Sequence, residues 1–173
     1  MAPEILSTEP AEVILGLITS EATQLTQQRK DATEKADRRM KYYLDVLFKK
    51  YPQVKFVSFN IYPADYSDGD VSSANSDVDD CKFNGIDDDD VLEWFELEPG
   101  DDITSTSREM VWSDEQRCSI PNPDLNQDNV DIVKAFTAVL QFKTLEEWIE
   151  EVGDSCTVLV EPSGIRTHDN YDY

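Results

Sequence analysis

The middle of the chain is so acidic that it limits where a hydrophobic core can form. Residues 65–131 contain twenty-one Asp and Glu but only three Lys and Arg, and they supply most of the formal net charge of −22. Like charges repel one another in a compact state, and unpaired charges are rarely buried. We therefore expect this segment to be laid over a folded body.

The overall composition is that of a folded chain with an unusual charge. A length of 173 residues fits one domain with an appendage, and 39% hydrophobic residues are too many for a wholly disordered acidic protein. The pI near 4.1 disfavours direct binding to nucleic acid or to an anionic membrane, because phosphate groups are neutralised by Lys and Arg. A basic protein or a cation remains as a partner.

The cysteines and the N-terminus indicate a cytoplasmic location. Cys81, Cys118 and Cys156 are odd in number, far apart and without CxxC spacing, which favours a reducing compartment over a disulfide scaffold. The first residues lack the basic region of a signal peptide, and the longest apolar run, residues 13–18, is too short for a membrane span.

Residues 1–50 are predicted to form a helical arm, separate from an acidic α+β domain at 51–173. Ser7 or Thr8, followed by Glu9 and Pro10, is typical of a helix start. The apolar residues that follow recur mostly at steps of three and four: Val13, Ile14, Leu17, Ile18, Ala22, Leu25, Ala32, Ala36, Met40, Tyr43, Leu44, Leu47 and Phe48.

A single helix of about forty residues would be roughly 60 Å long, which is more than one small core can cover. Two interpretations remain open. In the first, these residues form two helices, or one helix with a solvated middle. In the second, they form a self-associating antiparallel or coiled-coil arm, and on this basis we predict a homodimer through residues 13–48.

Two strands and a C-terminal helix complete the predicted fold. Residues 54–62 alternate between polar and apolar side chains, and residues 155–160 form an apolar run that we expect to pair with them. Residues 91–97 are a further strand candidate, with a short helix as the alternative, and the chain is expected to end in a polar tail after Gly164.

The predicted class is α+β: a long N-terminal helix, a small antiparallel sheet, and a C-terminal helix over 129–152 packed on the sheet. That helix has an amphipathic pattern, with a break at Lys143-Thr144 where Thr144 and Glu147 could form a capping box. The predicted core is Phe56 or Phe59, Ile61, Phe136, Leu140, Trp148, Ile149, Val158 and Val160.

Three stretches carry a resemblance to known proteins. They are a long helix that runs into KKYPQVKFVSFNIYPADYSDGD, an acidic segment that leads to VLEWFEL, and the closing EEVGDSCTVLVEPSGIRTHDNYDY. The chain resembles a group of small acidic, mostly phage-encoded proteins with a "Y-x-P-x-F-N-D-G-D"-like turn and a closing "GD-x-V-x-V-x-V-x-x-x-G-I" strand. Here the turn, residues 62–70, is shifted by one residue and has Tyr-Ser in place of Phe-Asn. The resemblance implies a phage origin and an α+β fold, and it implies no catalytic residue.

The residues do not indicate an enzyme. The single histidine, His168, falls in the predicted polar tail, where a general base or nucleophile partner would be poorly fixed. GxSxG, HExxH, P-loop and GxGxxG motifs do not occur in the sequence. We therefore predict no catalytic residue and no cofactor.

Clustered carboxylates could hold a hard cation, and Asp65, Asp68 and Asp70 are weak candidates for such a site. EF-hand spacing fails, however, because counting back from Gly69 puts Ala64 and Tyr66 at two ligand positions. Loose counter-ion condensation is the alternative, so no specific metal is predicted.

Three features favour a partner over a merely solvated charge run. The excess has one sign across nearly seventy residues, it is interleaved with Trp94, Phe95 and Trp112, and the basic residues are concentrated in the first helix. The candidate partner-binding residues are Asp77, Asp79, Asp80, Asp87, Asp88, Asp89, Asp90, Glu93, Trp94, Glu96, Glu98, Asp101, Asp102 and Trp112.

Carboxylates on a folded surface can take the place of phosphates in the basic groove of a nucleic-acid-binding protein, and their field speeds association. The predicted function is a phage-encoded DNA-mimic-type inhibitor of a host defence, restriction, nuclease or transcription factor in the host cytoplasm. The alternatives are an acidic structural or accessory phage protein without mimicry, and a calcium-binding module.

Overall fold

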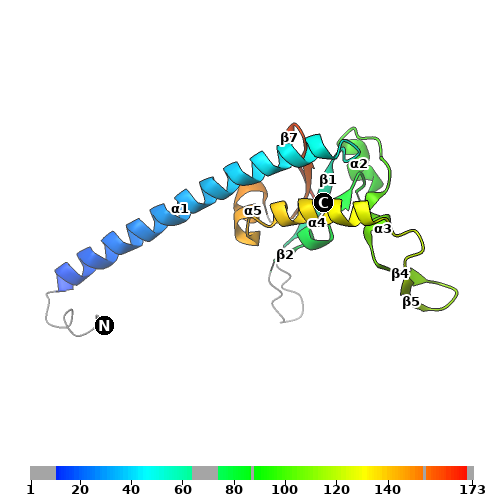
Figure 1. Cartoon of the computed structure of the whole chain (residues 1–173). Helices are drawn as coiled ribbons and strands as arrows, with labels where there is room; N and C mark the ends of the chain where they lie inside the picture. Colours follow the sequence, from blue (N-terminus) through cyan, green and yellow to red (C-terminus); the bar gives the residue numbers. More distant parts are fainter. Residues whose placement is uncertain (1–10, 64–73, 87, 154, 171–173) are drawn as a thin grey trace. The chain divides into compact units, whose positions relative to one another are not determined.

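The computed structural model of the chain describes residues 11–63, 74–86, 88–153 and 155–170, and it has the predicted α+β class (Figure 1). Its helices are α1 (Ala11–Lys50), α2 (Asp89–Trp94), α3 (Ile103–Ser107), α4 (Gln127–Leu140) and α5 (Leu145–Val152), with a 3-10 turn η3 at Val78–Asp80. Its strands are β1 (Val57–Tyr62), β2 (Asn75–Ser76), β3 (Lys82–Phe83), β4 (Met110–Ser113), β5 (Cys118–Pro121), β6 (Cys156–Glu161) and β7 (Gly164–Asp169).

The chain divides into two compact units within α1, between Arg38 and Arg39. α1 is one uninterrupted helix, so the alternative of two separate helices is wrong. In the first unit every side chain from residue 15 to residue 32 is exposed. Within the described residues, no helix combines the length and the apolar character that crossing a bilayer requires.

The second unit, residues 39–173, is built on an antiparallel sheet in which β1 and β6 are the central pair. Val57 lies opposite Val160 and Ile61 opposite Cys156, which confirms the predicted pairing of 54–62 with 155–160. β2 and β3 both pair with the other edge of β1. β7 pairs with β6 along its whole length, so the prediction of a polar tail after Gly164 is wrong for residues 164–169.

One face of this sheet carries the main core. Met40, Leu44 and Phe48, from the last turns of α1, are buried there together with Phe59 and Ile61 of β1. α4 and α5 contribute aromatic side chains: the rings of Phe136 and Trp148 pack edge-on, at 5.0 and 5.1 Å between centroids, against Phe48 and Phe59 respectively. The predicted core residues are all buried except Ile149, which is partly buried.

The predicted break in the C-terminal helix is confirmed. α4 ends at Leu140, and Thr144 begins α5 with the predicted capping box, in which its hydroxyl accepts a hydrogen bond from the Glu147 backbone N–H. Lys143 lies between the two helices and is buried. Its ammonium forms an ion pair with Glu151 and lies 4.7 Å from the centre of the Trp148 ring.

The opposite face of the sheet is covered by the acidic part of the chain. Phe56 and Leu159 of the sheet form a second buried cluster with Val91 and Phe95, which lie in and directly after α2. The strand predicted at 91–97 is therefore wrong, and the helical alternative is correct. Two buried apolar side chains one turn apart, Val91 and Phe95, hold this short helix on the sheet, while its exposed side carries acidic residues.

Candidate partner-binding surface

The most acidic part of the chain is a loop whose two ends meet at one residue. Residues 87–102 contain nine Asp and Glu and no Lys or Arg; we call residues 85–102 the acidic loop. At its base the carbonyl of Asn84 accepts a hydrogen bond from Gly100 N at 3.1 Å, and Asn84 Nδ2 donates to the Asp101 carbonyl at 3.1 Å. The loop is therefore closed by direct contacts and has a defined base.

Asn84 also ties this base to the chain that precedes β1. Its Oδ1 accepts from Lys55 N at 2.7 Å, and its Nδ2 donates to the Gln53 carbonyl at 2.9 Å. Asn84 is only 2% exposed and its φ of 59° is left-handed, a conformation that Asn adopts more readily than most residues. Gly100 allows the close approach, because a Cβ there would lie 2.9 Å from the Asn84 Cβ.

The aspartates at the start of the loop are compatible with its helix. Asp88 caps α2 by accepting a hydrogen bond from Asp90 N at 2.9 Å, and Asp89 and Asp90 occupy the first turn. Negative charge at a helix N-terminus interacts favourably with the partial positive charge of the free N–H groups. After Phe95 the chain turns away through Glu96, whose φ of 57° is left-handed.

Trp94 stands on the acidic loop as an exposed but supported aromatic side chain. It is 59% exposed, and its ring packs edge-on against Phe95 at 4.9 Å and His168 at 4.8 Å. Arg166, two residues before His168 on β7, holds the same region: its guanidinium lies 5.1 Å from the centre of the Phe95 ring and donates to the Phe95 carbonyl at 3.2 Å. β7 therefore contacts Trp94 directly through His168 and holds the neighbouring Phe95 through Arg166.

His168 and Arg166 are functional candidates that the sequence analysis missed, because their segment was assigned to the tail. His168 is fixed on a strand and half-buried, so the argument that it is poorly positioned is wrong. Two signals in the sequence pointed to this strand. Pro162 and Ser163 form a two-residue connection between paired strands, and Ile165 and Thr167 alternate with the two more polar residues.

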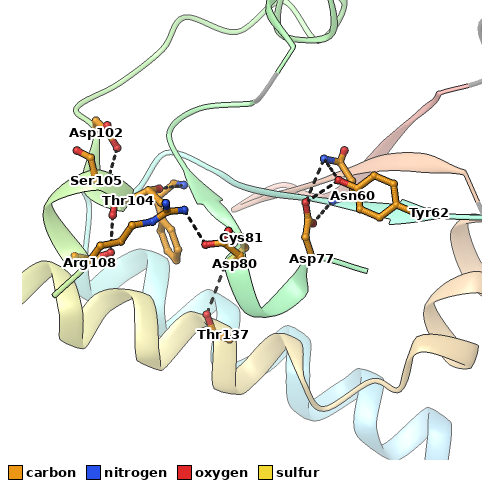
Figure 2. Close-up of polar contacts among 12 residues, drawn as sticks. Asn60, Tyr62, Asp77, Asp80, Cys81, Asp102, Thr104, Ser105, Arg108 and Thr137 are labelled. Atoms are coloured by element: carbon orange, nitrogen blue, oxygen red, sulfur yellow. Dashed lines mark hydrogen bonds and ion pairs between the residues drawn. The ribbon is translucent and has the colours of Figure 1, made fainter. Parts of the chain in front are cut away.

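Several predicted partner-binding carboxylates are instead engaged within the fold, as Figure 2 shows. The half-buried Asp77 carboxylate accepts hydrogen bonds from the backbone and side chain of Asn60 and lies 3.3 Å from the Tyr62 hydroxyl. Asp80 forms a 2.8 Å ion pair with Arg108. These carboxylates connect the segment after β2 to the sheet and to the chain after α3.

Asp79 and Asp102 also have internal partners. Asp79 accepts a hydrogen bond from the Gln141 side chain. Asp102 caps α3 by accepting from Ser105 N at 3.0 Å (Figure 2), and this backbone hydrogen bond lowers the pKa of the Asp102 carboxyl below its ordinary value. Both carboxylates are exposed, but each already stabilises a local contact.

The remaining predicted carboxylates make no hydrogen bond or ion pair with another described residue. All are exposed and all lie on the acidic loop: Asp89, Asp90, Glu93, Glu96, Glu98 and Asp101. They surround Trp94 in the sequence, and we call them, with Trp94, the acidic face. Because their charges are not neutralised by described neighbours, this is the part of the predicted surface best suited to a basic partner.

Trp112 belongs to a different element. It lies on the β4–β5 hairpin, is 64% exposed, and lines a hollow of about 470 Å³ together with Gly100 and Asp102 at the end of the acidic loop. Lys82 and Arg108, two of the three basic residues of 65–131, line the same hollow. This surface therefore has mixed charge, in contrast to the acidic face.

The three carboxylates considered for a cation, Asp65, Asp68 and Asp70, lie outside the described residues, as does the partner-binding candidate Asp87. Within the described residues, no three His, Cys, Asp or Glu side chains gather in a way that could hold a metal ion.

The three cysteines are free thiols. Cys81 and Cys156 are buried and Cys118 is exposed. Burial raises the pKa of the Cys81 thiol to about 11, so this group is held in the unreactive protonated form.

Comparison of the chain with protein-family models, with curated proteins and with solved structures gives no match. Phage origin and DNA mimicry therefore remain predictions that depend on the residues themselves.

Proposed function

We propose that this chain is an acidic interaction protein that inhibits a nucleic-acid-binding protein by occupying its basic surface, as a DNA mimic does. The observation that carries the proposal is the acidic face, where carboxylates without a partner among the described residues flank an exposed tryptophan in the sequence of a closed loop. The proposal includes a phage origin, action in the host cytoplasm, and a defence, restriction, nuclease or transcription factor as the partner.

The closed base of the acidic loop supports this function. Asn84 joins both ends of the loop, and Val91 and Phe95 fix α2 on the sheet. A backbone that is held in place before binding loses less conformational entropy when its carboxylates meet Lys and Arg side chains. Their common sign also raises the association rate with a basic protein, and the effect falls as salt shortens the Debye length from about 10 Å at 0.1 M to about 3 Å at 1 M.

Trp94 supplies an aromatic contact, which charged side chains alone do not provide. Tryptophan is enriched among residues that dominate binding energy, and most of this side chain is free to enter a partner's pocket. Its contacts with Phe95 and His168 restrict the side chain before binding, so it loses less conformational entropy when it binds.

The test uses two charge variants of equal size. The first neutralises the acidic face by Asp89→Asn, Asp90→Asn and Glu93→Gln. The matched control neutralises exposed carboxylates elsewhere by Asp114→Asn, Glu115→Gln and Asp124→Asn. Each protein is immobilised and exposed to bacterial host lysate at low and high salt, with and without chelator, and recovered nucleic-acid-binding proteins are then purified.

Fluorescence anisotropy with labelled duplex DNA gives the decisive measurement. The wild type and the control should displace DNA from the recovered protein, whereas the acidic-face variant should do so several-fold more weakly and associate more slowly. Recovery of no nucleic-acid-binding protein at low salt, or equal displacement by both variants, would overturn the proposal. Saturable heat on Ca²⁺ titration without any partner would favour the calcium-binding alternative instead, and an inert chain would favour the accessory-protein alternative.

The proposal also includes a homodimer through α1. The predicted range, residues 13–48, contains Met40, Leu44 and Phe48, which are buried in the core of the second unit. The surface of α1 available for a second copy therefore lies mainly before residue 39.

A further inference from the structure

One face of the helix in the first unit carries a regular seam. Its residues are separated alternately by three and four positions: Leu15, Ile18, Ala22, Leu25, Arg29, Ala32 and Ala36. Leu15, Ile18 and Leu25 are 64%, 58% and 58% exposed. This spacing is the a/d repeat of a coiled coil, sustained here for three heptads. Val13 and Leu17 are also exposed, but they lie off the seam near the start of α1.

We infer that the occupant of this seam is the same seam of a second copy, arranged antiparallel; this inference deepens the homodimer of the proposed function and rests on it. In an antiparallel pair Leu15 lies level with Ala32 of the other helix, and Ala22 lies level with Leu25. Each leucine thereby meets an alanine, so large and small side chains alternate across the contact and fill it evenly.

The charge in the seam selects the same orientation. In a parallel, in-register pair the two Arg29 side chains would face each other inside the seam, and like charges at such short range are unfavourable. In the antiparallel pair each Arg29 lies level with Ile18 of the other helix and within about one helical turn of its Glu21. The guanidinium can then reach an opposite charge while its aliphatic stem covers Ile18.

Alanines at three of the seam positions, Ala22, Ala32 and Ala36, let the two helices approach closely. A partner of unrelated sequence would need the same alternation of sizes and an acid in the right place, whereas a second copy has both by symmetry. The seam is thus self-complementary in one orientation only.

Spin-label distances in the full-length protein test the orientation. Labels are placed at Gln24→Cys or at Lys35→Cys in a Cys118→Ser background, since Cys81 and Cys156 are buried. In the antiparallel pair residue 24 lies near the two-fold axis, whereas the two copies of residue 35 are roughly 35 Å apart along the helices. The expected result is a short distance for Gln24→Cys and a long one for Lys35→Cys. Equal short distances at both sites would show a parallel pair and overturn the inference.

A second pair of variants tests the seam itself by sedimentation. Leu25→Glu should weaken dimerisation by about 100-fold, because each dimer loses two buried leucines and gains two charges. Gln24→Glu adds the same charge at an adjacent position outside the seam and should leave the dimer within about twofold of the wild type. A dimer that survives Leu25→Glu would overturn the inference.

The outcomes separate the inference from the function on which it rests. A wild-type monomer at tens of micromolar would remove both the homodimer and its antiparallel arrangement, whereas a parallel dimer would remove only the arrangement. The DNA-displacement experiment uses variants of other residues, those of the acidic face in the second unit, so its result is separate from that of the dimer experiments.

Discussion

Replacing Asn84 by Ala tests whether one side chain closes the acidic loop. The change removes three hydrogen bonds, those to Lys55 N and to the carbonyls of Gln53 and Asp101. A net contribution of about 1 kcal/mol for each gives a loss of roughly 3 kcal/mol. Ala is also less tolerant than Asn of the left-handed φ of 59°, which adds about 1 kcal/mol. We expect the free energy of unfolding to fall by about 4 kcal/mol.

Asn84→Gly is the matched control, because Gly adopts the left-handed conformation without steric strain. It should lose the hydrogen bonds but not incur the strain, so Asn84→Ala should be the less stable of the two by about 1 kcal/mol. Urea denaturation monitored by tryptophan fluorescence gives the two free energies. Hydrogen exchange gives the location of the change, which should be greatest at Gly100 and in the acidic loop.

Two results would refute this reasoning about Asn84. A loss below about 1 kcal/mol for Asn84→Ala would mean that water or a neighbouring group replaces all three contacts. Unchanged hydrogen exchange in the acidic loop, with the sheet destabilised, would mean that Asn84 supports the chain before β1 and does not close the loop.

Three further predictions follow from single residues. Asp102→Ala should lower the free energy of unfolding by about 1 kcal/mol at pH 7 through loss of the α3 cap. The hydrogen bond from Ser105 N depresses the pKa of Asp102, so the stabilising contribution of this carboxylate is present above its ordinary pKa of 3.8 and is lost as the pH falls below that value. Urea denaturation at pH 2 should therefore show a smaller difference between the variant and the wild type. Titration with a thiol reagent at pH 8 should modify Cys118 quickly and Cys81 only after denaturation, and fast modification of Cys81 in the folded protein would contradict its burial. Gly164→Ala should destabilise the β6–β7 hairpin by roughly 1–2 kcal/mol, because its φ of 141° is rarely adopted by residues with a side chain; an unchanged melting temperature would exclude this.

The elements that the sequence predicted correctly are those whose signal is local. Alternation in residues 54–62 reports a strand with one apolar face, and Thr144 with Glu147 reports a helix start through two short-range hydrogen bonds. The central pairing of β1 with β6 follows because these are the two most apolar extended segments of the chain.

The elements that were missed depend on the tertiary context. Residues 91–97 contain apolar side chains at spacings compatible with either a strand or a helix, and the Asp88 cap together with burial of Val91 and Phe95 decides for the helix. β7 is paired on one side only, to β6, and Ile165 is its one large apolar side chain, so the segment lacks the apolar pattern of an inner strand.

The candidate site was predicted as a region but not as an arrangement. Charge counting located the acidic residues, but it could not separate Asp77, which is bonded to β1, from Asp89, which has no described partner. Asn84 gave no signal at all, because its role comes from three backbone groups that are distant in sequence.

The central pairing of the sheet has a consequence for how the chain folds. The hydrogen bond from the Thr157 hydroxyl to Asn60 Oδ1 joins residues 97 positions apart, and the whole acidic segment lies between them. Closing a loop of that length costs about 4 kcal/mol of chain entropy before β1 and β6 gain any contact. Charge repulsion within the segment between β1 and β6 expands the unfolded chain and makes closure slower still. The refolding rate should therefore rise with salt over the same range in which association with a basic partner slows, and on the ribosome the sheet cannot form until its C-terminal strands have emerged.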